Sequence, residues 1–266
     1  MSRLVVRVAG IGLWGAGLPG WDAAAVALRE GGDVDFSKLQ KPSPPHLPPA
    51  ERRRAPETVL LAAQAAAEAC VAANRAPDTL PAIFGSLQGD VAITDYLCAT
   101  LATAPHELSP TKFHNSVHNA AVGYWTIATG CRAASTAMAA GRATVGASLL
   151  EAALQVYDTQ APVLLAVYDT AATGPLVDVV PNTRSFAFAL VLDTDAPGEP
   201  GARLALEPAT DAVTPTAAGS DWARDFVAHN TSAAALPLLE ALAGGVERRV
   251  LIEAGPAFFI DVAVRP

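Results

Sequence analysis

The sequence has few of the residues on which metal sites, disulfide scaffolds and charged surfaces depend. Of its 266 residues, three are cysteine, five are histidine and 17% are charged. The three cysteines have no metal-type spacing, and an odd number is no disulfide framework. Cys70 and Cys98 lie in apolar helical patterns, which predicts that both fill the core. We therefore expect no bound metal and no disulfide scaffold.

Long hydrophobic runs and basic clusters are also scarce. No stretch reaches the roughly 18 uninterrupted apolar residues of a membrane span, since Arg142, Glu151 and Asp158 interrupt the longest alanine-rich region. The formal net charge of −8 disfavours a nucleic acid held through its phosphates. Residues 2–15 resemble a signal peptide only weakly, because arginines alternate with apolar residues there and no clean cleavage site follows, and we interpret them as a first strand. These features predict a cytoplasmic protein with no membrane span and no nucleic-acid partner.

Two common enzyme signatures are absent. The glycines within residues 10–17 do not form G-x-G-x-x-G with a following helix and a later acid, so a dinucleotide site is not supported. The G-x-S-x-G nucleophile elbow is missing around Ser135 and Thr136, which disfavours a serine hydrolase. His114 and His118 stand four residues apart, but no third metal ligand follows at a useful spacing.

Apolar residues make up 51% of the chain and follow a pattern of alternating strands and helices. Expected strands cover residues 4–11, 80–86, 132–138, 161–170, 185–194, 202–208, 249–254 and 257–264. Expected helices cover residues 22–29, 56–73, 90–102, 119–130, 141–157 and 236–242. Residues 161–170 are almost wholly apolar, which is typical of a strand whose sheet is covered on both faces. The alternation predicts an α/β fold with mixed sheets sandwiched by helices.

Glycine and proline mark the breaks in this pattern. Residues 31–55 contain five prolines and are predicted to form a loop. The glycines from residue 10 onward are expected to break the first strand. Residues 198–201 are predicted to turn the chain so that the strands 185–194 and 202–208 form a hairpin. Residues 209–221 are interpreted as a polar linker.

Residues 109–168 contain a distinctive order of motifs. A loop ending in Asn-x-x-x-Gly leads a helix, and a short strand, a second helix and a buried strand follow. This order resembles the β-ketoacyl synthase family of the thiolase fold, with Asn119, Gly123 and Gly130 in the register of that family. The resemblance covers roughly residues 4–192. It implies a thiolase-like layered fold.

The resemblance also implies a ketosynthase-like N-terminal domain, residues 1–195, with a shortened C-terminal segment, residues 196–266, packing on it. A ketosynthase has a C-terminal half that supplies two catalytic histidines, whereas the only histidine after residue 192 here is His229. A condensing enzyme carries its acyl chain on a cysteine at the start of the helix after the short strand, where the helix dipole favours a thiolate. Ungapped threading puts Arg142 at that position, and a guanidinium cannot attack a thioester.

This combination is similar to that of chain-length factors, the pseudo-ketosynthases of polyketide and aryl-polyene assembly. The resemblance implies a non-catalytic subunit that pairs with an active β-ketoacyl synthase and walls the tunnel for the growing chain. It implies no cofactor on this chain, because the substrates would be carried on the phosphopantetheine of an acyl carrier protein. The implied partners are the active synthase and that carrier protein.

Two groups of side chains are candidates for these contacts. The interface or tunnel candidates are Phe113, His114, Ser116, His118, Asn119 and Arg142. The alternative for the cluster before the helix is a loop whose polar groups cap that helix or satisfy buried amides. Arg52, Arg53 and Arg54 form the only basic run. They are candidates for docking the acidic carrier protein, although a charge run is usually a solvated face.

Two other functions stay open. One is a self-contained acyl-binding or acyltransferring enzyme on a thiolase-like scaffold that uses Cys131 or Ser135. For Cys131 we expect a buried spectator, because a cysteine nucleophile needs a base within hydrogen-bond reach. The other is a homodimer whose interface keeps a relict fold stable.

Overall fold

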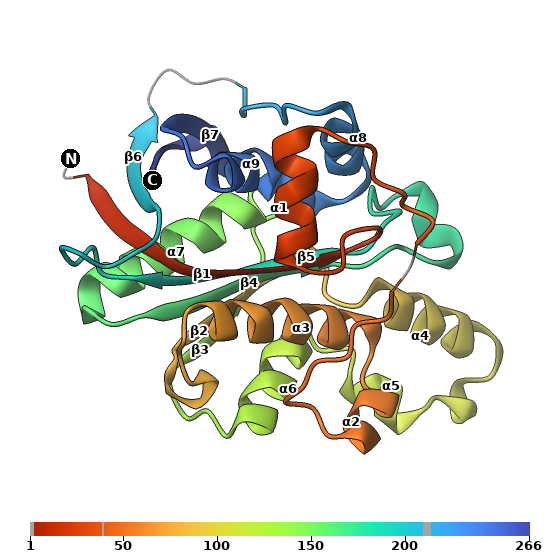
Figure 1. Ribbon diagram of the computed structural model, residues 1–266. Coiled ribbons are helices and arrows are strands. Elements are labelled where there is room, and N and C mark those ends of the chain that lie inside the picture. The colour runs from red at the N-terminus through yellow and green to blue at the C-terminus, as the bar shows by residue number, and fades with distance from the viewer. Residues whose placement is uncertain (1–2, 39, 210–213) are drawn as a thin grey trace.

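The computed structural model describes residues 3–38, 40–209 and 214–266. Within these ranges, eight strands form one mixed sheet in the order β3-β2-β4-β5-β1-β6-β8-β7. The strands are β1 (Leu4–Gly15), β2 (Ala82–Gly85), β3 (Ser135–Met138), β4 (Val163–Asp169), β5 (Phe186–Asp193), β6 (Arg203–Ala209), β7 (Arg248–Gly255) and β8 (Phe258–Arg265). Helices cover both faces of the sheet (Figure 1), which confirms the predicted α/β class.

The helices divide into two layers (Figure 1). On one side of the sheet lie α2 (Pro49–Arg54), α3 (Glu57–Ala72), α4 (Val91–Thr103), α5 (Pro110–His114) and α6 (Ala120–Thr129). On the other side lie α1 (Trp21–Glu30), α7 (Thr144–Thr159), α8 (Asp221–His229) and α9 (Leu236–Gly244). The short 3₁₀ helices in the connections are η1 (Pro77–Thr79), η2 (Pro105–Glu107), η3 (Gly174–Asp178) and η4 (Thr231–Ala235).

The two faces of the central strands carry side chains of different size. On β5, Ala187 and Ala189 belong to the core beneath α3. Phe186, Phe188 and Leu190 belong to the core beneath α7 and α9. Since successive residues of a strand point to opposite faces, the sequence FAFALVLD produces this division directly. The small side chains let α3, which is itself rich in alanine, lie close to the sheet.

The prediction that glycines break the first strand is wrong, because β1 continues to Gly15. The backbone of α3 lies directly on this strand. A Cβ atom at Gly10 would overlap the carbonyl oxygen of Ala69, and one at Gly12 would overlap that of Ala65. These glycines therefore serve the close approach of a helix rather than a turn.

The predicted hairpin between residues 185–194 and 202–208 is also wrong. β5 pairs with β4 and β1, and β6 pairs with β1 and β8, so β1 lies between the two strands. Buried Arg7 of β1 donates to Asp193 of β5 at 3.1 Å and to the carbonyl oxygen of Pro200 in the connection at 2.9 Å. The connection therefore crosses the first strand, and local sequence does not show this because the inserted strand is distant in the chain.

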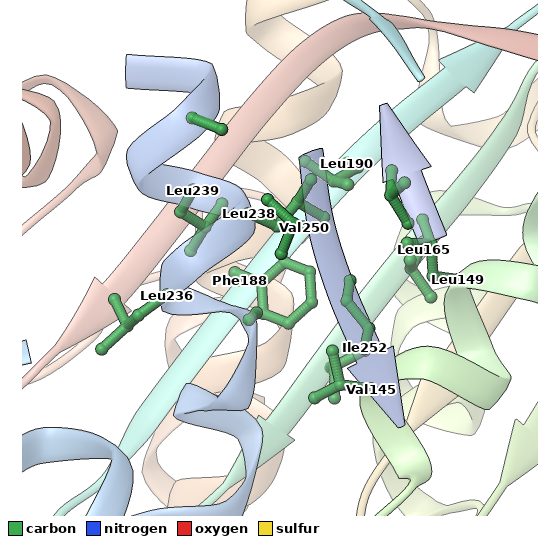
Figure 2. Packing of buried hydrophobic residues seen from close by; sticks show 14 of the residues in the cluster. Val145, Leu149, Leu165, Phe188, Leu190, Leu236, Leu238, Leu239, Val250 and Ile252 are labelled. Atoms are coloured by element: carbon green, nitrogen blue, oxygen red, sulfur yellow. The ribbon is translucent and has the colours of Figure 1, made fainter. Parts of the chain in front are cut away.

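The core beneath α7 contains side chains from both the N-terminal and the C-terminal part of the chain. Figure 2 shows residues of α7, β4 and β5 packing against residues of α9 and β7, and those labelled are Val145, Leu149, Leu165, Phe188, Leu190, Leu236, Leu238, Leu239, Val250 and Ile252. β6, β8 and β7 extend the same sheet as the preceding strands. The C-terminal residues thus complete the fold of the N-terminal ones, and the division at residue 195 stays a prediction.

Two segments contain helices that the sequence pattern did not predict. Residues 49–54 form α2 inside the expected proline-rich loop, because Pro48 and Pro49 stand at the start of the helix, where proline is tolerated. α8 begins at Asp221, at the end of the expected linker, and its N-cap residue Ser220 accepts a hydrogen bond from the amide of Ala223 through its side chain. Of the linker itself, residues 210–213 lie outside the described part of the chain.

The two cysteines predicted to fill the core differ in their positions. Cys70 is buried on α3, and burial raises the pKa of its thiol to about 12. Cys98 on α4 is exposed, so its prediction is wrong. α4 is rich in apolar residues, but of its side chains only Val91 and Ile93 are buried. An apolar sequence pattern shows that a helix needs covering, and it does not show what covers it.

We expect Gly12→Ala to destabilise the protein by about 2–3 kcal/mol, because the added methyl group forces α3 away from β1. Gly32→Ala is the matched control, since a Cβ atom there meets nothing within 4 Å, and it should change the free energy of unfolding by less than about 0.5 kcal/mol. Urea unfolding of the two variants measures the difference. Equal midpoints for both would contradict the proposed close contact.

Candidate functional site

The carboxyl ends of the parallel strands β2, β3 and β4 meet at one edge of the sheet. A cleft of about 660 Å³ opens at this edge, between the loop after β2, the turn before α7 and segments of the C-terminal part. Its lining includes Gln88, Arg142, Thr231 and Glu253. In open α/β sheets, ligands bind outside the carboxyl ends of parallel strands. The cleft is therefore the first candidate site.

A buried carboxylate lies beside this cleft. Asp169 is the last residue of β4 and is 2% exposed. One carboxylate oxygen accepts hydrogen bonds from the Ser86 hydroxyl at 2.9 Å and the Leu87 amide at 3.0 Å. The other accepts from the hydroxyls of Thr231 at 2.9 Å and Ser232 at 2.5 Å. Asp169 thus joins the loop after β2 to the start of η4.

Two buried asparagines extend this network. The side-chain amide of Asn230 donates to the carbonyl oxygens of Asp169 at 2.9 Å and Arg184 at 2.7 Å. The side-chain oxygen of Asn182 accepts from the backbone amide of Thr231 at 2.8 Å. Burial raises the pKa of Asp169 above its usual range, and the hydroxyl and amide donors offset this only in part. The network fixes three loops around one edge of the sheet.

The predicted interface cluster lies on α5, at the start of α6 and in the turn between them. Phe113 is 62% exposed, and His114 and Asn119 are also exposed. Ser116 donates its hydroxyl hydrogen to the carbonyl oxygen of Phe113 at 2.8 Å, within the same turn. Asn119 stands at the N-cap of α6, but its side chain makes no capping hydrogen bond. Side-chain capping therefore does not account for Asn119.

His118, from the same cluster, points toward the buried network. Its ring is half-buried, and Nε2 lies 2.9 Å from the carbonyl oxygen of Ser86. Because a carbonyl oxygen only accepts, Nε2 carries the hydrogen. His118 therefore ties the turn before α6 to the loop that also binds Asp169. The structure separates this histidine from its exposed neighbours.

A second hollow lies on the face of α6. This groove of about 480 Å³ runs between residues 47–51 and α6, and its lining includes Leu47, His114, Asn119, Gly123 and Ile127. We call it the α6 groove.

Large apolar side chains are also exposed along the segment from α4 to α6. They are Leu101 on α4, Phe113 on α5, Val117 in the following turn and Ile127 on α6. Ile127 is 84% exposed. The strand β3 lies at the adjacent end of the sheet and pairs, among the described strands, with β2 alone. Monomeric proteins seldom leave large apolar patches exposed, so this region, the α4–α6 surface, is a candidate interface.

Arg142 lies in the turn between β3 and α7, two residues before α7 begins at Thr144. Its exposed side chain lines the cleft. The same turn follows Met138, which ends β3 and packs partly buried against the core beneath α7. Residues 138–144 read MAAGRAT and contain no cysteine. No residue of this turn therefore carries a thiol that could act as the nucleophile.

The three arginines of the basic run lie on α2. Arg52 donates to the hydroxyl of Ser43 at 2.8 Å, whereas Arg53 and Arg54 are exposed. Glu51 of the same helix lines the α6 groove, so the basic run lies next to that groove. The structure does not place the run beside Arg142.

The alternative enzyme would use Cys131 or Ser135 as its nucleophile. Neither residue is arranged as a nucleophile with its base. Cys131 is 8% exposed, as predicted, and its thiol donates to the carbonyl oxygen of Leu80 at 3.4 Å. Ser135 is exposed at the edge strand β3. The hydrogen bonds of His118 and His229 are to backbone oxygens of Ser86 and Asp225.

Neither a metal site nor a membrane-spanning helix is present among the described residues. They contain no group of three or more His, Cys, Asp or Glu side chains placed to hold a metal ion. In the same ranges, no helix combines the length and the apolar character that a bilayer crossing requires.

The strand order, the two helical layers and the cleft at the ends of the parallel strands define a layered α/β protein of thiolase type. Residues 30–244 match the family described as the N-terminal domain of β-ketoacyl synthases. The match covers more than half of the chain, and the chain belongs to this family. No curated protein matches the sequence.

Solved structures share the fold at low sequence identity. One chain of a ketosynthase in complex with its chain length factor from Xenorhabdus doucetiae is 20% identical, with a TM-score of 0.73, covering 98% of this chain and 99% of that one. A type II polyketide-synthase acyl carrier protein in complex with its ketosynthase, bound to the hexaketide, contains a chain that is 13% identical, with a TM-score of 0.73 and 99% coverage of both. A β-ketoacyl synthase from Burkholderia phymatum STM815 is 14% identical, with a TM-score of 0.60, covering 91% of this chain and 77% of that one.

The buried network around Asp169 was missed at the level of sequence. Its residues come from four separate loops and strand ends, so no local spacing unites them. A signal was nevertheless present, because Asp169 ends a long apolar run and the segment 230–232 reads Asn-Thr-Ser. A polar residue that ends a buried strand commonly needs buried partners.

We expect Asp169→Asn to change how stability depends on pH. The folded state raises the pKa of Asp169, so it binds this proton more tightly than the unfolded chain does. The resulting stabilisation is fully present below about pH 4 and declines as the pH rises toward the folded-state pKa. The wild type should therefore lose unfolding free energy relative to D169N as the pH rises above about 4. Urea titrations at several pH values test this, and a relative gain by the wild type would contradict it.

Proposed function

We propose that the chain is the non-catalytic, chain-length-factor-like subunit of a ketosynthase heterodimer, and that it shapes the tunnel that receives the growing acyl chain. The observation that carries the proposal is the turn between β3 and α7. In a condensing enzyme this turn leads to the helix that presents the acyl-carrying cysteine. Here residues 138–144 contain no cysteine, and Arg142 offers only hydrogen-bond donors.

The kinds of structure that share the fold support a place in a ketosynthase complex. This chain matches 99% of a chain from the complex of a ketosynthase with its chain length factor, and 99% of a chain from the carrier-protein complex. The β-ketoacyl synthase from Burkholderia phymatum extends further, since only 77% of it is covered. Chains of this length therefore occur in ketosynthase complexes.

The α4–α6 surface and the edge strand β3 are the proposed contact with the active subunit. Phe113 and Ile127 expose more than half of their side-chain area, and covering them would remove apolar surface from water. Among the described strands β3 pairs with β2 alone, and an edge strand can offer its outer backbone groups to another chain. His114, Ser116 and Asn119 would lie at the same contact.

The alternative, an acyltransferring enzyme that uses Cys131 or Ser135, lacks support at the site. The Cys131 thiol donates to a backbone carbonyl and is almost fully buried. A nucleophilic cysteine needs a base to accept its proton. We therefore do not adopt this function.

Native mass spectrometry tests the proposed pairing. The tagged chain, purified from its native host, should carry a cysteine-bearing ketosynthase in a one-to-one complex. A lone monomer or a homodimer under the same conditions would contradict the proposal. The homodimer would instead favour the relict-interface alternative.

A decarboxylation assay tests the missing catalysis. The isolated chain should not decarboxylate a malonyl carrier thioester, and neither should the variants Arg142→Cys and Met138→Cys, because His229 is the only histidine of the C-terminal part. The heterodimer should be active. Decarboxylation by either isolated cysteine variant would contradict the assignment as a non-catalytic subunit.

Arg53 and Arg54 are the proposed contact with the acidic carrier protein, since both are exposed on α2. Reversing their charges in the double variant R53E/R54E should weaken carrier binding to the heterodimer by about tenfold at low salt. The effect should shrink as salt screens the charges. Arg29→Glu, an exposed arginine on α1, is the control. If R53E/R54E and the wild type bind the carrier protein with equal affinity, the basic run is only exposed to solvent and does not contact the carrier protein.

A further inference from the structure

The strand β7 stands at one end of the sheet, and a segment that is not a strand covers part of its outer edge. Among the described strands, β7 pairs with β8 alone. Residues 214–219, which we call the strap, lead to α8 and reach this edge at Thr216. The amide of Thr216 donates to the carbonyl oxygen of Leu251 at 2.9 Å, and the amide of Leu251 donates to the Thr216 hydroxyl at 2.8 Å. Thr216 therefore occupies both outward backbone groups of Leu251.

This pair of bonds resembles one step of an antiparallel ladder. In such a ladder, two residues that face each other exchange two bonds between amides and carbonyl oxygens. Thr216 supplies the amide of a neighbouring strand, but its side-chain hydroxyl takes the place of the carbonyl oxygen as acceptor. A strand from another chain that added to β7 would need the same two groups of Leu251. The strap and such a strand therefore exclude each other.

Two charged side chains hold the end of the strap. The carboxylate of Glu240 on α9 is 7% exposed and accepts hydrogen bonds from the amide of Gly219 at 2.8 and 2.9 Å. The guanidinium of Arg224 on α8 donates to the carbonyl oxygens of Ala218 at 2.8 Å and Gly219 at 2.6 Å. Both the amides and the carbonyl oxygens at this end of the strap are thus bound. The strap is held in place by α8 and α9 as well as by β7.

The neighbouring positions of the same edge are protected in other ways. Alternate residues of a strand direct their backbone groups to the same side, so Arg249 also faces outward. Its exposed side chain pairs with Asp261 at 2.7 Å, and charged side chains commonly protect sheet edges. Further along β7, the carbonyl oxygen of Glu253 lies against α7, where a Cβ atom at Gly146 would overlap it. Leu251 lies between these positions and carries no charge, so the strap covers the part of the edge that lacks another protection.

We propose that the strap protects the sheet against self-association, by preventing a second copy of this chain from adding a strand to β7. The inference goes beyond the proposed function and does not depend on it, because β3 and β7 stand at opposite ends of the sheet. A second copy is the occupant that the strap excludes, since each copy would present the same freed edge. Two identical edges can pair antiparallel about a twofold axis.

Substitution of Thr216 tests the strap in the full chain. Thr216→Pro removes both the amide donor and the hydroxyl, so the variant should self-associate about tenfold more tightly than the wild type in sedimentation velocity. Thr216→Ser keeps both groups and should behave as the wild type does. Adding Leu251→Pro to T216P removes an amide that donates to the strap and not to β8, and it should return self-association to the wild-type level.

A milder variant decides the case if T216P does not fold. Thr216→Val keeps the shape and the amide but removes the hydroxyl, so the Leu251 amide should exchange its hydrogen about tenfold faster than in the wild type. T216V should also self-associate more tightly than T216S.

Three results would overturn the inference. The first is an unchanged exchange rate of the Leu251 amide in T216V, which would show that the hydroxyl does not bind this amide. The second is equal self-association of the wild type and the folded Thr216 variants. The third is extra self-association of T216P that L251P does not reverse, which would place the contact away from the edge of β7.

Discussion

The close contact between α3 and the central strands is the constraint on which the rest of the structure depends. It requires a strand that contains Gly10 and Gly12 and neighbouring strands that carry alanine on the same face. With α3 so near on one side, the bulky residues of β5 must lie on the other, where they form the core with α7, α9 and β7. The C-terminal part is therefore needed to bury Phe186 and Phe188, and it cannot be a loosely attached appendage.

The same arrangement explains why the functional surfaces lie where they do. The parallel strands end at one edge, where Asp169 holds the adjoining loops together through hydrogen bonds to both of its carboxylate oxygens. His118 connects this edge to the turn before α6, so the rigid interior positions the start of the exposed helix.

The surface that remains uncovered is as informative as the core. α4 is rich in apolar residues and yet buries few of them, and Ile127 is almost fully exposed on α6. This exposed surface is the basis of the proposed contact with a partner subunit. The prediction that Cys98 is buried is wrong, because within the described residues only the start of the apolar helix α4 is covered.

The sequence by itself determined the class of the fold, most strands and helices, and the family. Periodicity suffices for these because the alternation of FAFALVLD and the helical spacing of residues 56–73 are local properties. The sequence also determined that the turn after β3 has no thiol. Only the tertiary structure decided that β1 separates β5 from β6 and that the buried network around Asp169 unites residues from four segments of the chain. Each of these depends on which distant backbone lies opposite a residue, and contacts between distant segments leave no periodic trace in the sequence.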